Sequence, residues 1–385
     1  MSRYFFYNVI LVSLLNLMLF VPYLLIQYRY KGAIMSMLCA AIVGTALALL
    51  FMHVMKTFPG KGLPEILRLF MPKPLTIPIL IVCAVMWLTA SSITMYAFSV
   101  LINRFFNPDT SSLVVLVFMC LVCMYAATRS TLTVIFVLEV GLIVCVPIIV
   151  FLLFKAFNSP MLDWDAIRTV SHYWNRGPQV KPFAASLFVF TGYMNFFMFN
   201  RLNSPNFRLR FRWGTPIFCS LILLTSFFIP IGFHGTEGAA DYLYIWSVTS
   251  DTLIMSYGFI ERVIFVFLLM YLMLSLIFAM IGWHMGMEMI KSCLPEKKEA
   301  IDPARTPRSN WVIVGLFAVL TVAYAYWFNE KENLKITSHW IVLRACVEIV
   351  SVLFVFVLSL FGSGKRKKLV SHENTSHNAA SPDGA

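Results

Sequence analysis

The sequence predicts an all-α polytopic membrane protein with about ten transmembrane helices. Of its 385 residues, 59% are hydrophobic and only 12% are charged, whereas soluble domains carry about 25% charged residues. The hydrophobic residues form long continuous runs, and a spanning helix needs roughly 20 such residues. A membrane β-barrel would instead show short segments of alternating hydrophobicity, so helices are favoured.

Ten hydrophobic runs, separated by short polar segments, are long enough to be spans. We expect them at residues 4–27, 33–55, 75–102, 112–128, 132–155, 183–200, 214–233, 256–287, 311–328 and 339–362. Residues 1–362 would then form one transmembrane domain. Residues 363–385 would form a basic, disordered cytoplasmic tail, with the KRKK run at 365–368 near anionic lipid headgroups.

The distribution of basic residues predicts the orientation. With the N-terminus in the cytoplasm, 19 of the 30 Lys and Arg residues fall in cytoplasmic segments and 9 in outer segments. By the positive-inside rule, both termini should be cytoplasmic. The net charge of +12 is explained by these loop clusters, so we expect the lipid bilayer as a partner and no nucleic acid.

The sequence offers no pattern typical of an enzyme, a cofactor site or a metal site. It has no GxxxxGK[ST] loop, so ATP-driven transport by this chain is not expected. Seven of the eight cysteines lie within hydrophobic runs, and Cys120 and Cys123 form a single CxxC with no second pair. We interpret them as buried thiols without metal or redox chemistry.

Interruptions within spans are the best candidates for a ligand site, because transporter-like proteins bind solutes where helices break. In the sixth span, the polar or small residues Thr191, Gly192, Tyr193 and Asn195 interrupt an aromatic run. Gly192 would allow either an unwound backbone or a close contact between two helices. Both alternatives are open from composition.

Two other spans carry polar residues that could face a ligand. The first contains Ser13, Asn16 and Pro22, and the proline should kink it. The third contains Ser91 and Thr94 within a polar stripe. Hydrogen bonds between helices, or close packing, are the alternative roles of these residues.

Charged residues within spans are candidate structural or coupling groups. Glu139 lies about two turns into the fifth span, and Glu261 and Arg262 lie near the outer end of the eighth. In the tenth span, Arg344 and Glu348 are four residues apart, a spacing that allows a local ion pair. Such pairs most often neutralise each other.

Three stretches carry a resemblance to a known family. They are FPGKGLPEI at 58–66, FVFTGYMNFF at 188–197 and FIERVIFVFLLMYL at 259–272. With the number of spans and the chain length, they make the sequence similar to the membrane B subunit of GerA-type spore germinant receptors, a branch of the amino acid–polyamine–organocation transporter superfamily.

The resemblance implies a LeuT-like core of two inverted five-helix repeats, with the first and sixth helices broken around a nutrient site. It further implies an amino acid as the ligand, A and C subunits as partners, and location in the inner membrane of the spore. The alternatives are a proton- or sodium-coupled amino-acid permease and a membrane scaffold that no longer binds a solute.

Overall fold

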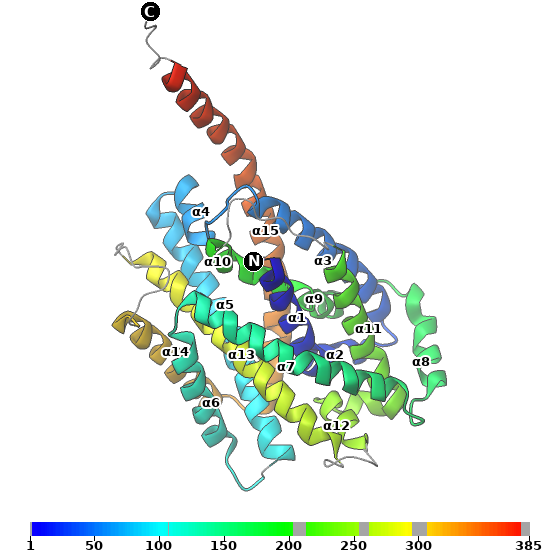
Figure 1. Ribbon diagram of the computed structural model, residues 1–385. Coiled ribbons are helices and arrows are strands. Elements are labelled where there is room, and N and C mark those ends of the chain that lie inside the picture. Colours follow the sequence, from blue (N-terminus) through cyan, green and yellow to red (C-terminus); the bar gives the residue numbers. More distant parts are fainter. Residues whose placement is uncertain (1, 107, 203–212, 254–261, 295–305, 379–385) are drawn as a thin grey trace, which may run out of the picture.

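In the computed structural model, all described regular structure is helical (Figure 1). The description covers residues 2–378 except 107, 203–212, 254–261 and 295–305, with side chains only as far as Phe361. The α-helices are α1 (Ser2–Met18), α2 (Phe20–Ile26), α3 (Ala33–Met55), α4 (Leu63–Phe70), α5 (Lys73–Phe105), α6 (Ser112–Ala127), α7 (Thr131–Phe157), α8 (Trp164–Ser171), α9 (Val180–Phe188), α10 (Phe196–Phe199), α11 (Gly214–His234), α12 (Ile245–Thr252), α13 (Val263–Cys293), α14 (Arg308–Trp327) and α15 (Glu330–Asn378). Four 3₁₀ turns complete them: η1 (His172–Asn175), η2 (Thr191–Asn195), η3 (Asn200–Leu202) and η4 (Gly238–Asp241).

Each predicted span corresponds to a helix or to a bent pair of helices. Among the described residues, seven helices are long and apolar enough to cross a membrane, and two bent pairs bring the number to nine. The shorter apolar helix α6 occupies the fourth predicted span. The protein is therefore a polytopic helical membrane protein.

Two boundaries differ from the prediction by more than a few residues. The eighth span continues to Cys293 instead of ending at 287, and part of its predicted start lies outside the described residues. The tenth begins at Glu330, nine residues before the predicted 339. The predicted tail, 363–385, lies outside the described side chains.

The first span is broken even though it contains no glycine. Helices α1 and α2 are bent by 54°, and Leu19 between them has non-helical backbone angles of φ −79° and ψ −121°. Pro22 explains the position of the break. It cannot donate a hydrogen bond to the carbonyl of Met18, and its ring would clash with that carbonyl in a continuous helix.

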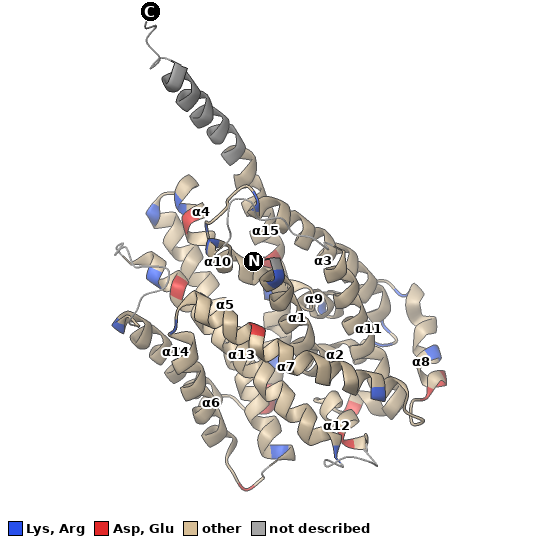
Figure 2. Cartoon of the chain, in the orientation of Figure 1, with Lys and Arg blue, Asp and Glu red and all other residues tan. Residues whose placement is uncertain are grey.

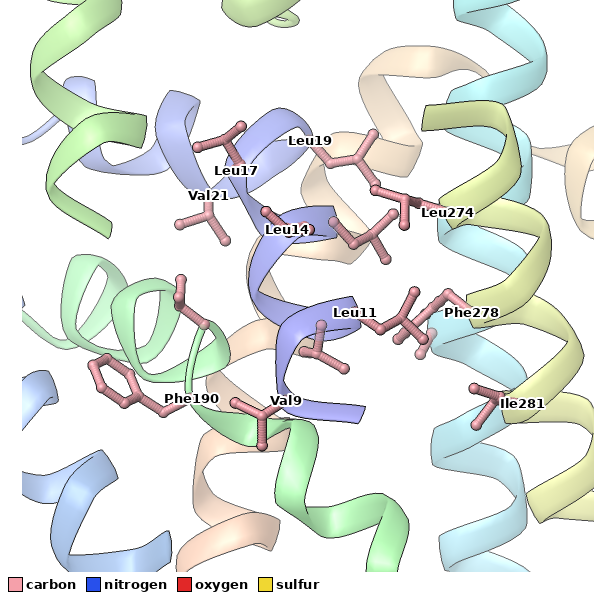
Figure 3. Packing of buried hydrophobic residues seen from close by; sticks show 14 of the residues in the cluster. Val9, Leu11, Leu14, Leu17, Leu19, Val21, Phe190, Leu274, Phe278 and Ile281 are labelled. Carbon is pink, nitrogen blue, oxygen red and sulfur yellow. The ribbon is translucent and has the colours of Figure 1, made fainter. Parts of the chain in front are cut away.

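The sixth span is broken at the predicted residues. Helix α9 and the segment from Thr191 to Leu202 are bent by 58°, and the turn η2 forms the break. Both broken spans lie in the middle of the bundle. In Figure 3, Leu11 of α1 points toward Phe278 of α13, and Leu19, at the break, lies beside Leu274 of the same helix. Helix α1 is therefore enclosed by protein, as expected for a helix that is apolar on all sides.

Loops predicted to share a side of the membrane contact one another. At the predicted cytoplasmic end, Arg201 bonds to Glu65 and to Glu288. At the other end, Arg29 pairs with Glu237 and Arg104 pairs with Glu330. Most charged side chains therefore gather near the two ends of the bundle (Figure 2). This arrangement supports the predicted grouping of the loops into two sides.

Candidate functional site

A cavity of about 70 Å³ lies on the side of the broken sixth span that faces α15. Its wall is formed by α5, α9, η2, α10, α13 and α15, and Leu63 of α4 lies in the wall as well. A single water needs about 10–15 Å³ of such space, so several waters or a small solute would fit. The aromatic members of the wall are Trp87, Phe188, Phe197, Phe278 and Trp340.

The charged members of the wall are Arg344 and Glu348, one turn apart on α15. Arg344 Nη1 lies 2.6 Å from Glu348 Oε2, and the side chains are only 7% and 1% exposed. Removing two charges from water is costly, and a buried pair is tolerated only when its remaining polar atoms are also bonded. The partners of this pair therefore determine what the site can do.

The partners of Glu348 come from the break in the sixth span. Tyr193 Oη donates to Glu348 Oε1 over 2.6 Å, and Thr191 Oγ1 lies 3.0 Å from Glu348 Oε2. Thr191 also lies within hydrogen-bond distance of Arg344 Nη1. The carboxylate thus has three partners, and the ion pair joins α15 to the unwound turn η2.

Arg344 is less completely bonded than its partner. Its Nη2 donates to the carbonyl of Ala184 over 3.3 Å, and its guanidinium lies 4.4 Å from the ring centre of Phe188. Its Nε is buried and has no hydrogen-bond partner among the described residues, and the same is true of Nε1 of Trp340. The cavity wall therefore contains two residues with an unsatisfied N–H donor.

The opposite face of the break packs against the first span. Asn195 Nδ2 donates to Asn8 Oδ1 over 2.8 Å, and Ser13 Oγ donates to the carbonyl of Val189 over 2.7 Å. A Cβ atom at Gly192 would lie 2.4 Å from the carbonyl oxygen of Asn8. Both interpretations of Gly192 therefore apply, because it lies in an unwound turn and permits a close helix contact.

The other predicted ligand residues have local partners or packing roles. Asn16 donates to the carbonyl of Val12 within its own helix. Ser91 donates to the carbonyl of Trp87 and occupies the space beside Gly282 of α13. Thr94 is buried in α5. Of the eight predicted ligand residues, the structure places Thr191 in the cavity wall. Ligand binding by all eight stays a prediction.

The two predicted coupling charges that the structure describes, Glu139 and Arg262, lie away from the cavity wall. Glu139 forms a 3.2 Å ion pair with Arg3, which joins α7 to α1. Arg262 pairs with Asp251 over 2.6 Å near the N-terminal end of α13. Glu261 lies outside the described residues. Among the described residues, no group of three His, Cys, Asp or Glu side chains is arranged to hold a metal ion.

Arg201 of η3 joins this turn to α4 and α13 at the Leu63 end of the cavity. Its Nη2 and Nε donate to the two carboxylate oxygens of Glu65 over 2.6 and 3.1 Å, and its Nη1 donates to Glu288 over 2.9 Å. Phe197 and Met289, close in sequence to Arg201 and Glu288, are in the cavity wall. We call Arg201, Glu65 and Glu288 the basal cluster.

Sequence reasoning identified the spacing of Arg344 and Glu348 but treated the pair as structural. The signal that could have raised its importance is the depth of both residues within a span, since buried intramembrane charges are functional candidates. Trp340 carried no separate signal, because one more aromatic residue in an apolar helix is unremarkable. Trp340 lies one turn before Arg344 on α15, so helical spacing places the two on one face. Only the packing shows that this face meets Phe188, whose ring centre lies 5.5 Å from that of Trp340.

Comparison with known protein families identifies one that matches most of the chain. Residues 5–333 match the family model of the spore permeases, which is described as "Spore germination protein". No curated protein matches the chain. The match includes both broken spans and ends before Arg344 and Glu348. Because the model spans most of the sequence, the chain belongs to the spore germination protein family of membrane permeases.

Proposed function

We propose that this chain is the membrane subunit of a nutrient germinant receptor, and that it binds an amino acid in the cavity beside Arg344. Three findings support the proposal: membership in the spore germination family, the broken first and sixth spans, and a cavity bounded by the sixth break. In this proposal the chain works with A and C subunits in the inner membrane of the spore. Its core is a LeuT-like pair of inverted repeats with both termini in the cytoplasm.

One observation carries the proposal: Arg344 is part of the cavity wall, and its Nε has no hydrogen-bond partner among the described residues. An arginine side chain with a free donor favours a carboxylate, to which it forms a charge-assisted hydrogen bond. Nε1 of Trp340 supplies a second donor. The aromatic rings of the wall can hold an ammonium group by cation–π attraction and can pack against an apolar side chain.

Binding at Arg344 would act on the break through contacts already present. Arg344 and Glu348 bond to Thr191 in η2, and the other face of η2 packs against Asn8 of α1. A ligand changes an equilibrium only as far as it binds one conformation better than another. A carboxylate that draws Arg344 away from Thr191 would favour a different position of η2 and hence of α1.

The test removes one donor without removing the aromatic ring. In spores, Trp340→Phe keeps an aromatic ring for the edge-on contact with Phe188 but loses the N–H group. We expect the concentration of amino acid needed for half-maximal dipicolinic acid release to rise about tenfold, the loss of one hydrogen bond to a charged group. Leu343→Ala, on the exposed face of the same helix, is the matched control. An unchanged dose response for Trp340→Phe, at equal protein abundance, would contradict the proposal.

A proton- or sodium-coupled amino-acid permease is the second candidate, since the family is one of permeases. Proteoliposomes separate the two. A receptor should bind the amino acid saturably, with no accumulation under either ion gradient. Accumulation that an ionophore abolishes would establish the permease.

A further inference from the structure

One face of α15 is polar along its buried length, beyond the cavity. Asn333, Thr337, Arg344 and Glu348 recur at intervals of three to four residues or their multiples, so they share one side of the helix. All four are buried. Asn333 and Arg344 are 11 positions apart, which is about 16 Å along the helix axis at 1.5 Å per residue.

Three N–H donors on this face have no hydrogen-bond partner among the described residues. They are Nδ2 of Asn333, Nε1 of Trp340 and Nε of Arg344. Buried polar groups in proteins are almost always bonded to protein or to ordered water. An isolated orphan can reflect local packing, but three along one face point to water as their shared partner.

Polar side chains of neighbouring helices continue this face near Asn333. Tyr324 Oη of α14 donates to Asn333 Oδ1 over 2.6 Å, and the ring of Tyr96 of α5 packs edge-on against Tyr324. The face then ends at Glu330, which forms a 2.8 Å ion pair with Arg104. This end of the bundle is opposite the basal cluster.

We propose that the buried face of α15 from Glu330 to Arg344 is a hydrated path by which a small water-soluble solute reaches the cavity. Three of its unsatisfied groups are N–H donors, and one is an acceptor, Oε1 of Glu330 at the entrance; the other oxygen of that carboxylate, Oε2, pairs with Arg104. Because donors predominate between the entrance and the cavity, the path favours solutes that carry acceptors, in particular carboxylates. Entry is from the end that carries Arg104 and Glu330, which the charge distribution predicts to be the outer one.

The first test needs no substitution. Radiolytic hydroxyl-radical footprinting of the intact protein in nanodiscs oxidises side chains beside water, and peptide mass spectrometry measures the rate at each tryptophan. Trp246 is the internal control, because it is also buried but its Nε1 donates to the carbonyl of Ser226. We expect Trp340 to be oxidised at least fivefold faster than Trp246. Equal rates would overturn the path.

The second test measures access and charge preference. In vesicles, Thr337→Cys should react at least tenfold faster with a membrane-impermeant thiosulfonate than Ile341→Cys or Leu343→Cys, which are the packed and the exposed controls on the same helix. A reagent bearing a sulfonate should react faster than one bearing a quaternary ammonium. Reaction at the control rate, reaction only from the side of the basal cluster, or preference for the cation would each contradict the proposal.

The path rests only in part on the proposed function. Neither measurement contains a nutrient, so a hydrated face without nutrient binding would refute the receptor and leave the path. Nutrient binding with a dry face would refute the path and leave the receptor.

Discussion

Gly192 leaves no room for a side chain between the sixth span and α1: a Cβ atom there would lie 2.4 Å from the carbonyl oxygen of Asn8 and 2.4 Å from Cα of Val9. Both neighbours are backbone atoms, which cannot rotate away. The contact joins the two broken spans at the middle of the bundle. Two hydrogen bonds cross the same boundary, one from Ser13 to the carbonyl of Val189 and one from Asn195 to Asn8.

Gly192→Ala should therefore destabilise the protein by about 1–3 kcal/mol, the cost of overpacking a close contact. Gly315→Ala in α14 is the matched control, because a Cβ atom there would meet nothing within 4 Å. Thermal unfolding in detergent, followed by tryptophan fluorescence, should show a lower midpoint for Gly192→Ala than for the unmodified protein. The midpoint of Gly315→Ala should not be lowered. Equal midpoints would mean that α1 and η2 separate easily.

The buried pair on α15 predicts an asymmetry between single and double variants. Arg344→Met leaves Glu348 buried without its cation and should cost about 3–5 kcal/mol. Combining it with Glu348→Gln removes the charge while keeping an acceptor for Tyr193, and should recover most of the loss. We expect both variants to lose the germination response. A double variant as unstable as the single one would show that the charge is not the source of the instability.

The basal cluster predicts how firmly α4 is held. Arg201→Ala removes a bidentate contact to Glu65 and one to Glu288, and should cost about 2 kcal/mol. Arg201→Lys keeps the charge but not the planar fork, so its effect should be intermediate. Hydrogen exchange in peptides from α4 should therefore be fastest in Arg201→Ala, intermediate in Arg201→Lys and slowest in the unmodified protein.

The control for the basal cluster is Arg168→Ala. Arg168 pairs with Asp165, and both side chains are largely exposed, so the pair should contribute little to stability. Its exchange pattern should match that of the unmodified protein. Unchanged exchange in α4 after Arg201→Ala would contradict the assigned role of Arg201.

Pro22 predicts a separation of stability from function. Pro22→Ala restores an N–H group that can bond to the carbonyl of Met18, so α1 and α2 gain a reason to form one helix. We expect unfolding at an equal or higher temperature, together with a weaker germination response. Pro147→Ala is the control, since Pro147 lies inside the unbroken helix α7 and its replacement should leave the response unchanged. A normal response with Pro22→Ala would show that the break does not depend on the proline.

Much of the fold could be predicted because the bilayer imposes strict requirements on sequence. Ten hydrophobic runs appear as helices or bent pairs, and Pro22 and Gly192 indicated where two of them break. The start of α15 was missed, because Glu330 and Lys331 read as a loop although they form the first turn of a helix. The candidate site was identified only in part: Thr191 was predicted and lines the cavity, but Trp340 had no distinctive pattern.

The sequence alone determined that the chain crosses the membrane as helices, because long apolar runs must satisfy their backbone hydrogen bonds internally in lipid. It also located the breaks in two helices, because proline and glycine change the backbone conformation within one helical turn of their own position. Only the tertiary structure decided which side of the sixth break is closed and which is open. Gly192 packs against α1 with no space left, and Thr191, one residue earlier, faces Arg344 and Glu348 beside a cavity. Whether a side of the break is open depends on where α15 lies relative to residues about 150 positions earlier in the sequence. No local sequence pattern specifies a contact between residues so far apart.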